Sequence, residues 1–359
     1  MNVVKATRNF ERWLRAQLRI VEGDLREKHK LMTQDEFLFF RGTFYRWAQI
    51  WPKRCTDLAS APKVFGVGDL HVGSCGTWRD KVGRLVWGID DFDEAFPVPY
   101  TNDLVRLAAS ARLATSLEHL AINSKDACDA ILQGYMESLQ SGGSPIVLEN
   151  ANKWLVSIAL SRLDNPADFW KKMESNPTAR KPFPAAATKA WKQMFPEIGL
   201  KYRVVKRTAG TGSLGHERLV AIAEWRGGKF ALEAKILAPS AWGWAQGKVT
   251  NAIYSGHVIQ NALQCRDPFM AVRNRWLIKR LAPDSCPIEI ETLPKKRQED
   301  RLLHAAGWEA ANIHLGSRHA AHRVQRDLKK RRAGWLRVAA KEMCEAVNRD
   351  WKHWRKENL

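Results

Sequence analysis

The chain has 359 residues, of which 45% are hydrophobic and 27% charged, proportions typical of a globular protein with a sizeable core. Its 58 Lys and Arg against 38 Asp and Glu leave a net charge of +20, which favours an anionic partner such as a nucleotide, a phosphorylated metabolite or nucleic acid. The sequence lacks a signal-peptide pattern, a membrane-spanning run of roughly 18–20 apolar residues and zinc-finger cysteine spacing, so we expect a cytoplasmic protein.

The first half of the chain is predicted to be mainly helical. Apolar residues recur every three or four positions over residues 7–50, as in amphipathic helices. Residues 63–95 change to short apolar runs around a glycine-rich turn, which predicts strand, loop, strand, loop. A second helical stretch follows the N-cap pair Thr101-Asn102. Further helices are predicted at 125–140 and 150–162.

The second half begins with β structure. Residues 165–196 are rich in proline and predict an irregular connection, which we take as the boundary between two lobes. Residues 201–237 alternate with period two and predict three strands, the last two joined by a hairpin turn at Arg226-Gly227-Gly228.

The remaining residues are predicted to be helix, strand and then helix again. Residues 250–265 have a helical pattern, and 274–292 are typical of strand, turn, strand. From about residue 298 helices are expected, ending in a basic helix with one apolar stripe. The expected parts are therefore a helical part (1–196), a β-rich part (197–295) and C-terminal basic helices that return to the helical part (296–359), in an α+β fold.

Residues 210–215, GTGSLG, match the pattern G-x-G-x-x-G. In a dinucleotide-binding fold this loop opens a helix, whereas in a kinase-type site it joins two antiparallel strands and covers phosphates. An alternating strand follows the glycines here, which favours the second structure over a Rossmann oxidoreductase. Lys235, on the third strand, is placed to reach under the loop toward phosphates. The candidate cofactor-binding residues are Gly210, Thr211, Gly212, Ser213, Gly215 and Lys235.

Two carboxylate-bearing loops precede the glycine loop. Phosphoryl transfer needs a carboxylate near the acceptor hydroxyl and hard oxygen ligands for Mg²⁺. Asp69 and His71 are the candidate catalytic residues, although His71 alternatively braces its loop. The candidate metal ligands are Asp91, Ser74 and Asp93. The alternative is that residues 90–94, with four carboxylates in five positions, form a solvated acidic turn.

Taken in order, these motifs carry a family resemblance. GDLHVGSCG (68–76) followed by IDDFDEA (89–95) is similar to the catalytic and metal loops of aminoglycoside- and choline-kinase-like enzymes. The chain from about residue 35 to 320 resembles the bacterial family of domain of unknown function 2252. The motifs that carry this second resemblance are FRGT (40–43), the Asp69 and Asp91 loops, Asp103 to Ser110, the glycine loop and Lys235.

The resemblance implies a two-lobed, protein-kinase-like fold in circularly permuted order, with the catalytic and metal loops first. It implies a phosphotransferase that uses ATP and Mg²⁺, in which Asp69 is the catalytic Asp and Asp91 the main metal ligand. By the same resemblance Asp103 braces the catalytic loop, and Arg41 either braces the site or contacts phosphate.

The chain departs from the family pattern at two points. Ser74 stands where the family has Asn, which weakens the second metal position. No Asp or Glu lies between Ile236 and Arg266, so the strand lysine lacks the usual helix glutamate, and Gln260 or Gln264 is left as a neutral partner. A weak or inactive, nucleotide-binding pseudokinase is therefore an alternative to an active enzyme.

Two other functions stay open. Transfer of AMP uses the same phosphate and metal parts, and sequence does not separate it from phosphorylation of a small-molecule or protein acceptor. The C-terminal region 318–356 carries 13 Lys and Arg against 4 Asp and Glu, with Trp351 and Trp354, and basic charge with aromatic side chains can bind nucleic acid by stacking. Because both Trp lie on the apolar stripe, we expect them to be buried.

Overall fold

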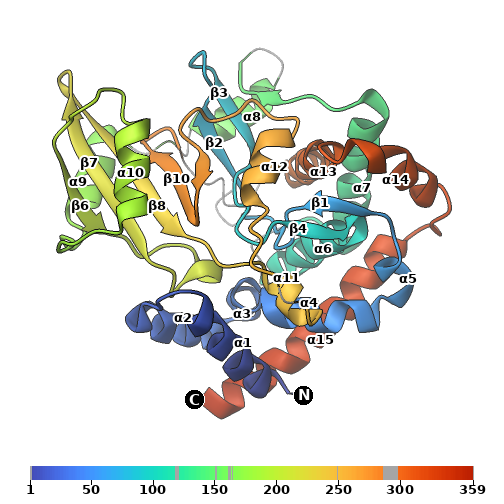
Figure 1. Cartoon of the computed structure of the whole chain (residues 1–359). Coiled ribbons are helices and arrows are strands. Elements are labelled where there is room, and N and C mark those ends of the chain that lie inside the picture. The colour runs from blue at the N-terminus through green and yellow to red at the C-terminus, as the bar shows by residue number, and fades with distance from the viewer. Residues whose placement is uncertain are drawn as a thin grey trace.

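A computed structural model describes residues 2–117, 121–149, 152–160, 163, 165–248, 250–285 and 298–358 (Figure 1). Over these residues the protein has a mixed α and β fold, in agreement with the predicted α+β class, and its strands form three small sheets. In this part of the chain no helix has the length and apolar character needed to cross a membrane.

The predicted N-terminal helices are present. They are α1 (Val3–Gln17), α2 (Glu22–Gln34), α3 (Glu36–Gly42) and α4 (Phe44–Arg54), and the short α5 (Thr56–Ala59) follows beyond the predicted range. Two of these helices have an N-cap side chain. Asn2 accepts a hydrogen bond from the Lys5 amide at the start of α1, and Asp35 accepts one from the Leu38 amide at the start of α3. Their apolar faces meet in the main core, where Trp47 and Trp51 are fully buried.

Four strands then place the two carboxylate loops side by side. They are β1 (Lys63–Gly66), β2 (Cys75–Arg79), β3 (Leu85–Ile89) and β4 (Phe96–Pro99). β1 pairs with β4, and β2 pairs with β3, which also pairs with the short β5 (Ile146–Val147). The loop after β1 ends where β2 begins, and the loop after β3 begins at the same end of the β2–β3 pair. The two loops are therefore adjacent, and the Asp90 amide donates to the Ser74 carbonyl at 3.0 Å.

Helix α6 (Tyr100–Ser116) begins one residue before the predicted N-cap pair. The prediction that Thr101 and Asn102 cap this helix is wrong, because both lie in its first turn and are fully buried. The Thr101 hydroxyl instead donates to the Leu58 carbonyl, and the Asn102 amide donates to the Gly68 carbonyl. Helix α6 is buried along most of its length, so its polar residues are available to hold the loops around it.

The remaining helices of this part are α7 (Ser124–Ser141), α8 (Lys153–Leu160), α13 (Glu299–Leu315), α14 (Ala321–Leu328) and α15 (Trp335–Asn358), with a short 3₁₀ turn before α14, η3 (Arg318–Ala320). Of these, α7, α13 and α15 pack against α6. Helix α15 packs against α6 and also against α1 to α4 (Figure 1). The C-terminal helices thus return to the helical part.

The β-rich part is a five-stranded antiparallel sheet in the order β6-β7-β8-β10-β9 (Figure 1). Its strands are β6 (Tyr202–Lys206), β7 (Arg218–Trp225), β8 (Gly228–Ile236), β9 (Ala271–Arg273) and β10 (Trp276–Leu281). Between β7 and β8, Arg226 and Gly227 both have positive φ, as the predicted hairpin turn requires. Residues 286–292 of the predicted strand pair lie outside the described residues.

The prediction of an irregular connection over 165–196 is wrong. This segment forms α9 (Pro166–Glu174) and α10 (Ala185–Met194), which pack on opposite faces of the sheet. Pro166 is the first residue of α9, behind the cap Asn165, and Pro184 precedes α10; proline is tolerated there because those amides have no helical partner. The β-rich part therefore begins with α9, about thirty residues before the predicted boundary.

The connection from β8 to β9 contains two short helices, α11 (Ala241–Ala245) and α12 (Ser255–Asn261). The predicted helix at 250–265 is thus shorter than expected. Helix α11 packs against α4 and approaches β4, whereas α12 packs against β9 at the edge of the five-stranded sheet. This connection therefore ties the two parts together.

Candidate functional site

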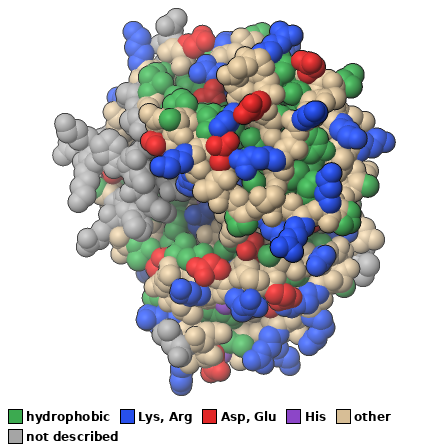
Figure 2. Space-filling model, turned by 90° about the vertical axis from the view of Figure 1, so that its left-hand side faces the viewer, with side chains coloured by type: hydrophobic (Ala, Val, Ile, Leu, Met, Phe, Trp, Pro, Cys, Tyr) green, Lys and Arg blue, Asp and Glu red, His purple; other side chains and the backbone are tan. Residues whose placement is uncertain are grey.

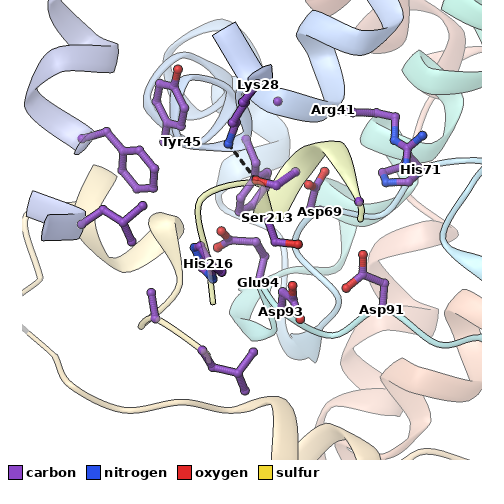
Figure 3. Close-up of a pocket in the computed structure, with 18 of the residues that line it drawn as sticks. Lys28, Arg41, Tyr45, Asp69, His71, Asp91, Asp93, Glu94, Ser213 and His216 are labelled. Atoms are coloured by element: carbon purple, nitrogen blue, oxygen red, sulfur yellow. Dashed lines mark hydrogen bonds between the residues drawn. The ribbon is translucent and has the colours of Figure 1, made fainter. Parts of the chain in front are cut away.

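The described residues enclose a cavity of about 60 Å³ where the two parts of the molecule meet (Figure 3). Its walls come from α1, α2 and α3, from the loop after β1, from the loop after β3, and from the loop between β6 and β7. The last three are the two predicted carboxylate-bearing loops and the glycine loop. They are called the catalytic loop (residues 67–74), the acidic loop (90–95) and the glycine loop (207–217). Asp69, His71, Asp91, Asp93, Gly210, Gly212 and Ser213 line the cavity, whereas Ser74, Thr211, Gly215 and Lys235 do not.

Asp69 is held by a buried arginine from α6. Arg106 is fully buried and its Nε donates to Asp69 Oδ1 at 2.6 Å, while a terminal nitrogen donates to the Phe40 carbonyl at 3.1 Å. The guanidinium also lies 3.9 Å from the centre of the Phe40 ring. Burial raises the pKa of Asp69, and the charge of Arg106 opposes this shift. The carboxyl is thus fixed in position, with one face toward the cavity.

Asp103, on α6, stabilises the catalytic loop through hydrogen bonds, as predicted. Its carboxylate accepts from the amides of Val67 and Gly68 at 2.7 and 3.0 Å, and His314 Nε2 lies 3.0 Å from the same group. Gly68 has φ +80°, and a Cβ there would stand 2.3 Å from the Glu94 carbonyl oxygen. This turn therefore requires glycine.

His71 and Ser74 stabilise the catalytic loop internally. The Ser74 hydroxyl accepts from the His71 amide at 3.0 Å and donates to the Asp69 carbonyl at 3.4 Å. Since Ser74 is fully buried and faces its own loop, the structure does not place it as the metal ligand that the sequence analysis proposed. Burial, together with the charge of Arg41, moves the pKa of His71 well below its usual value. The imidazole is therefore neutral, and its Nδ1 accepts from the Gly73 amide at 3.1 Å.

The acidic loop is paired with lysines of the five-stranded sheet. Asp90 forms an ion pair with Lys279 on β10, and Asp93 forms one with Lys235 on β8. Asp91 Oδ1 lies 4.0 Å from Lys235 Nζ, and half of its side chain is exposed. Burial raises the pKa of Asp91, but the nearby positive charge of Lys235 opposes this shift, and the net shift is downward. The alternative of a solvated acidic turn therefore does not describe Asp90 and Asp93, because both carboxylates are ion-paired.

Glu94, the last carboxylate of this loop, has a different environment. Burial raises its pKa to about 7. Its Oε2 accepts from the Ser240 hydroxyl at 2.8 Å and from the Ala241 amide at 2.7 Å. Glu94 therefore links the acidic loop to the start of α11.

The glycine loop lies directly over the catalytic loop. It contains a short 3₁₀ turn, η1 (Thr211–Ser213), entered through Gly210 at φ +74°. A Cβ at Gly212 would stand 3.3 Å from the Arg41 carbonyl oxygen and 3.6 Å from Asp69 Oδ2. Ser213 accepts a hydrogen bond from Arg218 at 2.5 Å. Gly212 is therefore the point at which the glycine loop approaches Asp69.

Lys235 is buried in β8 and brings the two motif groups together. It pairs with Asp93, which is 142 residues away along the chain. Gln264, a proposed neutral partner, instead donates to Glu309 at 2.6 Å and to the Ile89 carbonyl. The charge partner of the strand lysine thus comes from the acidic loop and not from a helix.

Two residues of the cavity were missed by the sequence analysis. Lys28 from α2 is 7% exposed and donates to the Gly212 carbonyl at 2.7 Å. His216 follows the glycine loop, and burial, followed by the charge of Lys28, lowers its pKa to about 3. A signal for Lys28 existed, because it lies three residues after Leu25 and four before Met32, both buried. It therefore occupies the apolar stripe of an otherwise polar helix.

The carboxylates of the cavity are the candidate ligands for a magnesium ion. Within the described ranges, no group of three or more His, Cys, Asp or Glu is arranged to hold a metal ion. Asp91 and Asp93 do line the cavity. Mg²⁺ commonly takes only one or two carboxylates and completes its shell with water and substrate phosphates. The donor atoms of this pair are of the type and number that such an ion takes from a protein.

Of the two tryptophans that were expected to be buried on the basic C-terminal helix, one is buried and the other is only half-buried. Trp354 is 2% exposed and packs edge-on against His29, and Trp351 is half-buried. The burial of Trp354 does not favour stacking of nucleic-acid bases on that side chain. On the face of the molecule shown in Figure 2, Lys and Arg side chains are spread among Asp and Glu.

Comparison with known proteins gives one match. Residues 19–197 match the model of a family described as "Uncharacterized protein conserved in bacteria (DUF2252)". No curated protein and no solved structure matches the chain. The matched segment includes the catalytic and acidic loops and ends before the glycine loop. Over residues 19–197 the chain is therefore similar to the DUF2252 family.

Proposed function

We propose that the protein is an ATP- and Mg²⁺-dependent phosphotransferase with a kinase-like site in permuted order. One observation carries the proposal: Lys235, on the strand that follows the glycine hairpin, is ion-paired with Asp93 and lies 4.0 Å from Asp91. In kinases, a glycine-rich loop, a strand lysine, a catalytic Asp and a metal-binding Asp surround the same triphosphate. Here the residues of these four types come from both halves of the chain.

Each group has a role in this proposal. Asp69, fixed by Arg106, would accept or orient the proton of the acceptor hydroxyl. The amides of Gly210 to Ser213 would face phosphate oxygens, because glycine permits close backbone approach. Lys235 would provide a point charge for the phosphates, and its pair with Asp93 already holds its ammonium group beside the acidic loop.

Magnesium would be held by Asp91, with Asp93 as a second carboxylate, and would neutralise charge on the transferred phosphoryl group. Ser74 has no part in this arrangement, because its hydroxyl is hydrogen-bonded within the catalytic loop. This leaves fewer protein ligands than the family pattern provides.

The cavity must open for a nucleotide to enter. Its volume of about 60 Å³ is enough for a few water molecules, whereas ligand pockets usually span roughly 300–1,000 Å³. The glycine loop contacts the catalytic loop at Gly212 and packs against α2 at Gly215. We infer that binding lifts this loop and widens the space between the two parts.

Thermal unfolding with increasing MgATP tests the proposal. At about 100 times the dissociation constant a ligand stabilises the folded protein by roughly 2.7 kcal/mol. We expect a concentration-dependent rise in Tm for the wild type and a large reduction of this rise for Asp91→Asn. Asp129→Asn, at an exposed site on α7, is the matched control and should respond like the wild type.

Mass spectrometry after incubation with ATP then separates the chemical outcomes. A gain of one phosphate supports phosphoryl transfer, a gain of AMP supports nucleotidyl transfer, and binding without modification or turnover supports a pseudokinase. If MgATP leaves the wild-type Tm unchanged, the nucleotide-site proposal is wrong.

A further inference from the structure

Lys28 is a buried ammonium group without a carboxylate partner. It is 7% exposed, and its Nζ donates to one acceptor, the Gly212 carbonyl, at 2.7 Å. Among the residues that the structure describes, none of the salt bridges includes Lys28. An ammonium group has three donors, so this one is only partly satisfied.

Burying such a charge is unfavourable unless something compensates for it. Burial lowers the pKa of Lys28, whereas the more distant carboxylates of Glu11, Glu94 and Asp69 raise it, and the net shift is downward. Perturbed groups that line a cavity are often functional. The helix surface offers exposed positions for a lysine, such as that of Lys30, so burial at position 28 needs an explanation.

The surroundings of Lys28 indicate what would compensate for it. The side chain points into the cavity from α2, above Asp69 and Ser213 (Figure 3). Among the residues that the structure describes, its hydrogen-bond acceptor is the Gly212 carbonyl of the glycine loop. The stem runs beside Gly42, where a Cβ would stand 3.5 Å from the Lys28 Cε. An anion bound beneath the glycine loop would lie within reach of this flexible side chain.

Helix α2 also holds the glycine loop at its far end. The Val21 amide donates to the Gly215 carbonyl at 2.8 Å, and the Thr208 hydroxyl donates to Asp24 at 3.2 Å. A Cβ at Gly215 would stand 3.7 Å from Leu25. The start of α2 and the glycine loop are thus joined at these three contacts, and Lys28 adds a fourth from a side chain that lines the cavity.

We propose that Lys28 is a second phosphate-binding lysine of this site. It holds the glycine loop down through the Gly212 carbonyl when no nucleotide is bound, and it transfers its hydrogen bond to phosphate oxygens when a nucleoside triphosphate enters. The inference rests on the proposed function and adds a residue from α2 to it. It makes α2 part of the phosphate site, in addition to the strand lysine.

A lysine-reactive acyl-phosphate derivative of ATP tests this on the wild-type protein. Such a probe acylates amines that lie beside its phosphates, and mass spectrometry identifies the modified positions. We expect both Lys28 and Lys235 to be labelled, excess MgATP to suppress the labelling of both, and Lys30 to be labelled no more than other surface lysines. Labelling of Lys235 without Lys28 would overturn the inference and leave the proposed function standing. Absence of labelling at both would contradict both.

Variants give an independent measurement. Lys28→Met removes the charge but keeps the apolar stem, and Lys30→Met makes the same change at an exposed position of α2. We expect Lys28→Met to bind MgATP and inorganic tripolyphosphate about tenfold more weakly or worse, to bind adenosine as the wild type does, and to fold with an unchanged or higher Tm because an uncompensated buried charge is lost. Lys30→Met should match the wild type in all three titrations.

These titrations distinguish failure of the Lys28 proposal from failure of the proposed function. Unchanged tripolyphosphate affinity in Lys28→Met, or an equal loss of adenosine affinity, contradicts a phosphate contact. If Lys28→Met does not fold, Lys28→Gln and the labelling experiment decide the question. If the wild type binds neither MgATP nor tripolyphosphate, the proposed function itself fails.

Discussion

At the scale of single residues, the site is organised by charges that are buried but paired. Arg106 holds Asp69, Lys235 holds Asp93, and Lys279 holds Asp90. Each pair joins segments that are distant in the sequence. Removing one partner of such a pair leaves an uncompensated charge, which is why these contacts specify the arrangement more than they add net stability.

Glu94 carries a pH dependence that can be measured. Its pKa of about 7 in the folded protein lies above the ordinary value of 4.5. The folded protein therefore binds this proton more tightly than the unfolded chain, so the contribution of Glu94 to stability is complete below about pH 4.5 and is lost as the pH rises through about 7. We expect Glu94→Gln, which stays neutral, to gain stability relative to the wild type as the pH rises.

Urea unfolding at several pH values between about 5 and 8 measures this difference. The comparison with the wild type cancels the opposite effect of buried His216, whose lowered pKa favours the fold at higher pH. Glu27→Gln, at an exposed position of α2, is the control and should leave the pH dependence unchanged. A constant difference between Glu94→Gln and the wild type would show that Glu94 is charged throughout.

At the scale of elements, two glycines set the packing of α7 against α13. A Cβ at Gly134 would stand 1.9 Å from the His304 carbonyl oxygen, and one at Gly307 would stand 2.0 Å from the Ile131 carbonyl oxygen. The backbones of these helices thus touch where side chains would otherwise separate them. Because α13 carries His314, which contacts Asp103, this packing also supports the catalytic loop.

Gly134→Ala is therefore expected to destabilise the protein. A methyl group at this position must push two helix backbones apart, at a cost of about 1–3 kcal/mol or more. Gly23→Ala, the same substitution in the first turn of α2, meets nothing closer than 4.0 Å and should stabilise by about 0.4–1 kcal/mol. Urea unfolding of both variants provides the measurement, and equal effects of the two would contradict the close helix contact.

The elements themselves were largely predictable, because periodicity is a local property. The four N-terminal helices, the three strands around the glycine loop and the turn at Arg226-Gly227 follow from spacing and turn residues. Helices α9 and α10 did not, because Pro166 and Pro184 were interpreted as breaking helices, although both stand at helix starts. Proline alone does not distinguish a helix start from an irregular segment.

At the scale of the whole molecule, the acidic loop connects the two parts. Lys235 and Lys279 project from the five-stranded sheet to residues that follow β3, and Glu94 bonds to the start of α11. These contacts are polar, and they line or border the cavity. Movement of one part relative to the other would therefore act directly on the candidate site.

A double-mutant cycle on Lys235 and Asp93 tests this connection. Lys235→Met leaves Asp93 buried without its partner and is expected to cost about 3–5 kcal/mol. Asp93→Asn should cost less, because Asp91 remains 4.0 Å from Lys235. The double variant should be more stable than the sum predicts, with a coupling of about 0.5–3 kcal/mol in urea unfolding.

The exposed pair of Lys125 and Asp129 serves as the control cycle. Its coupling should stay below about 1 kcal/mol, because exposed ion pairs are screened by water. A Lys235–Asp93 coupling as small as that of the exposed pair would mean that the two parts do not hold each other in solution as they do in this structure.

The local features could be predicted from the residues alone: the glycine hairpin, the strand that carries Lys235, the order of the carboxylate loops and the excess of positive charge. The folded arrangement was needed to show that Asp93 is the partner of Lys235, that Ser74 faces its own loop, and that Lys28 is buried over the glycine loop. The reason is physical. Backbone preference and periodicity act over a few residues, whereas the partner of a buried charge depends on which distant segments pack together and exclude water.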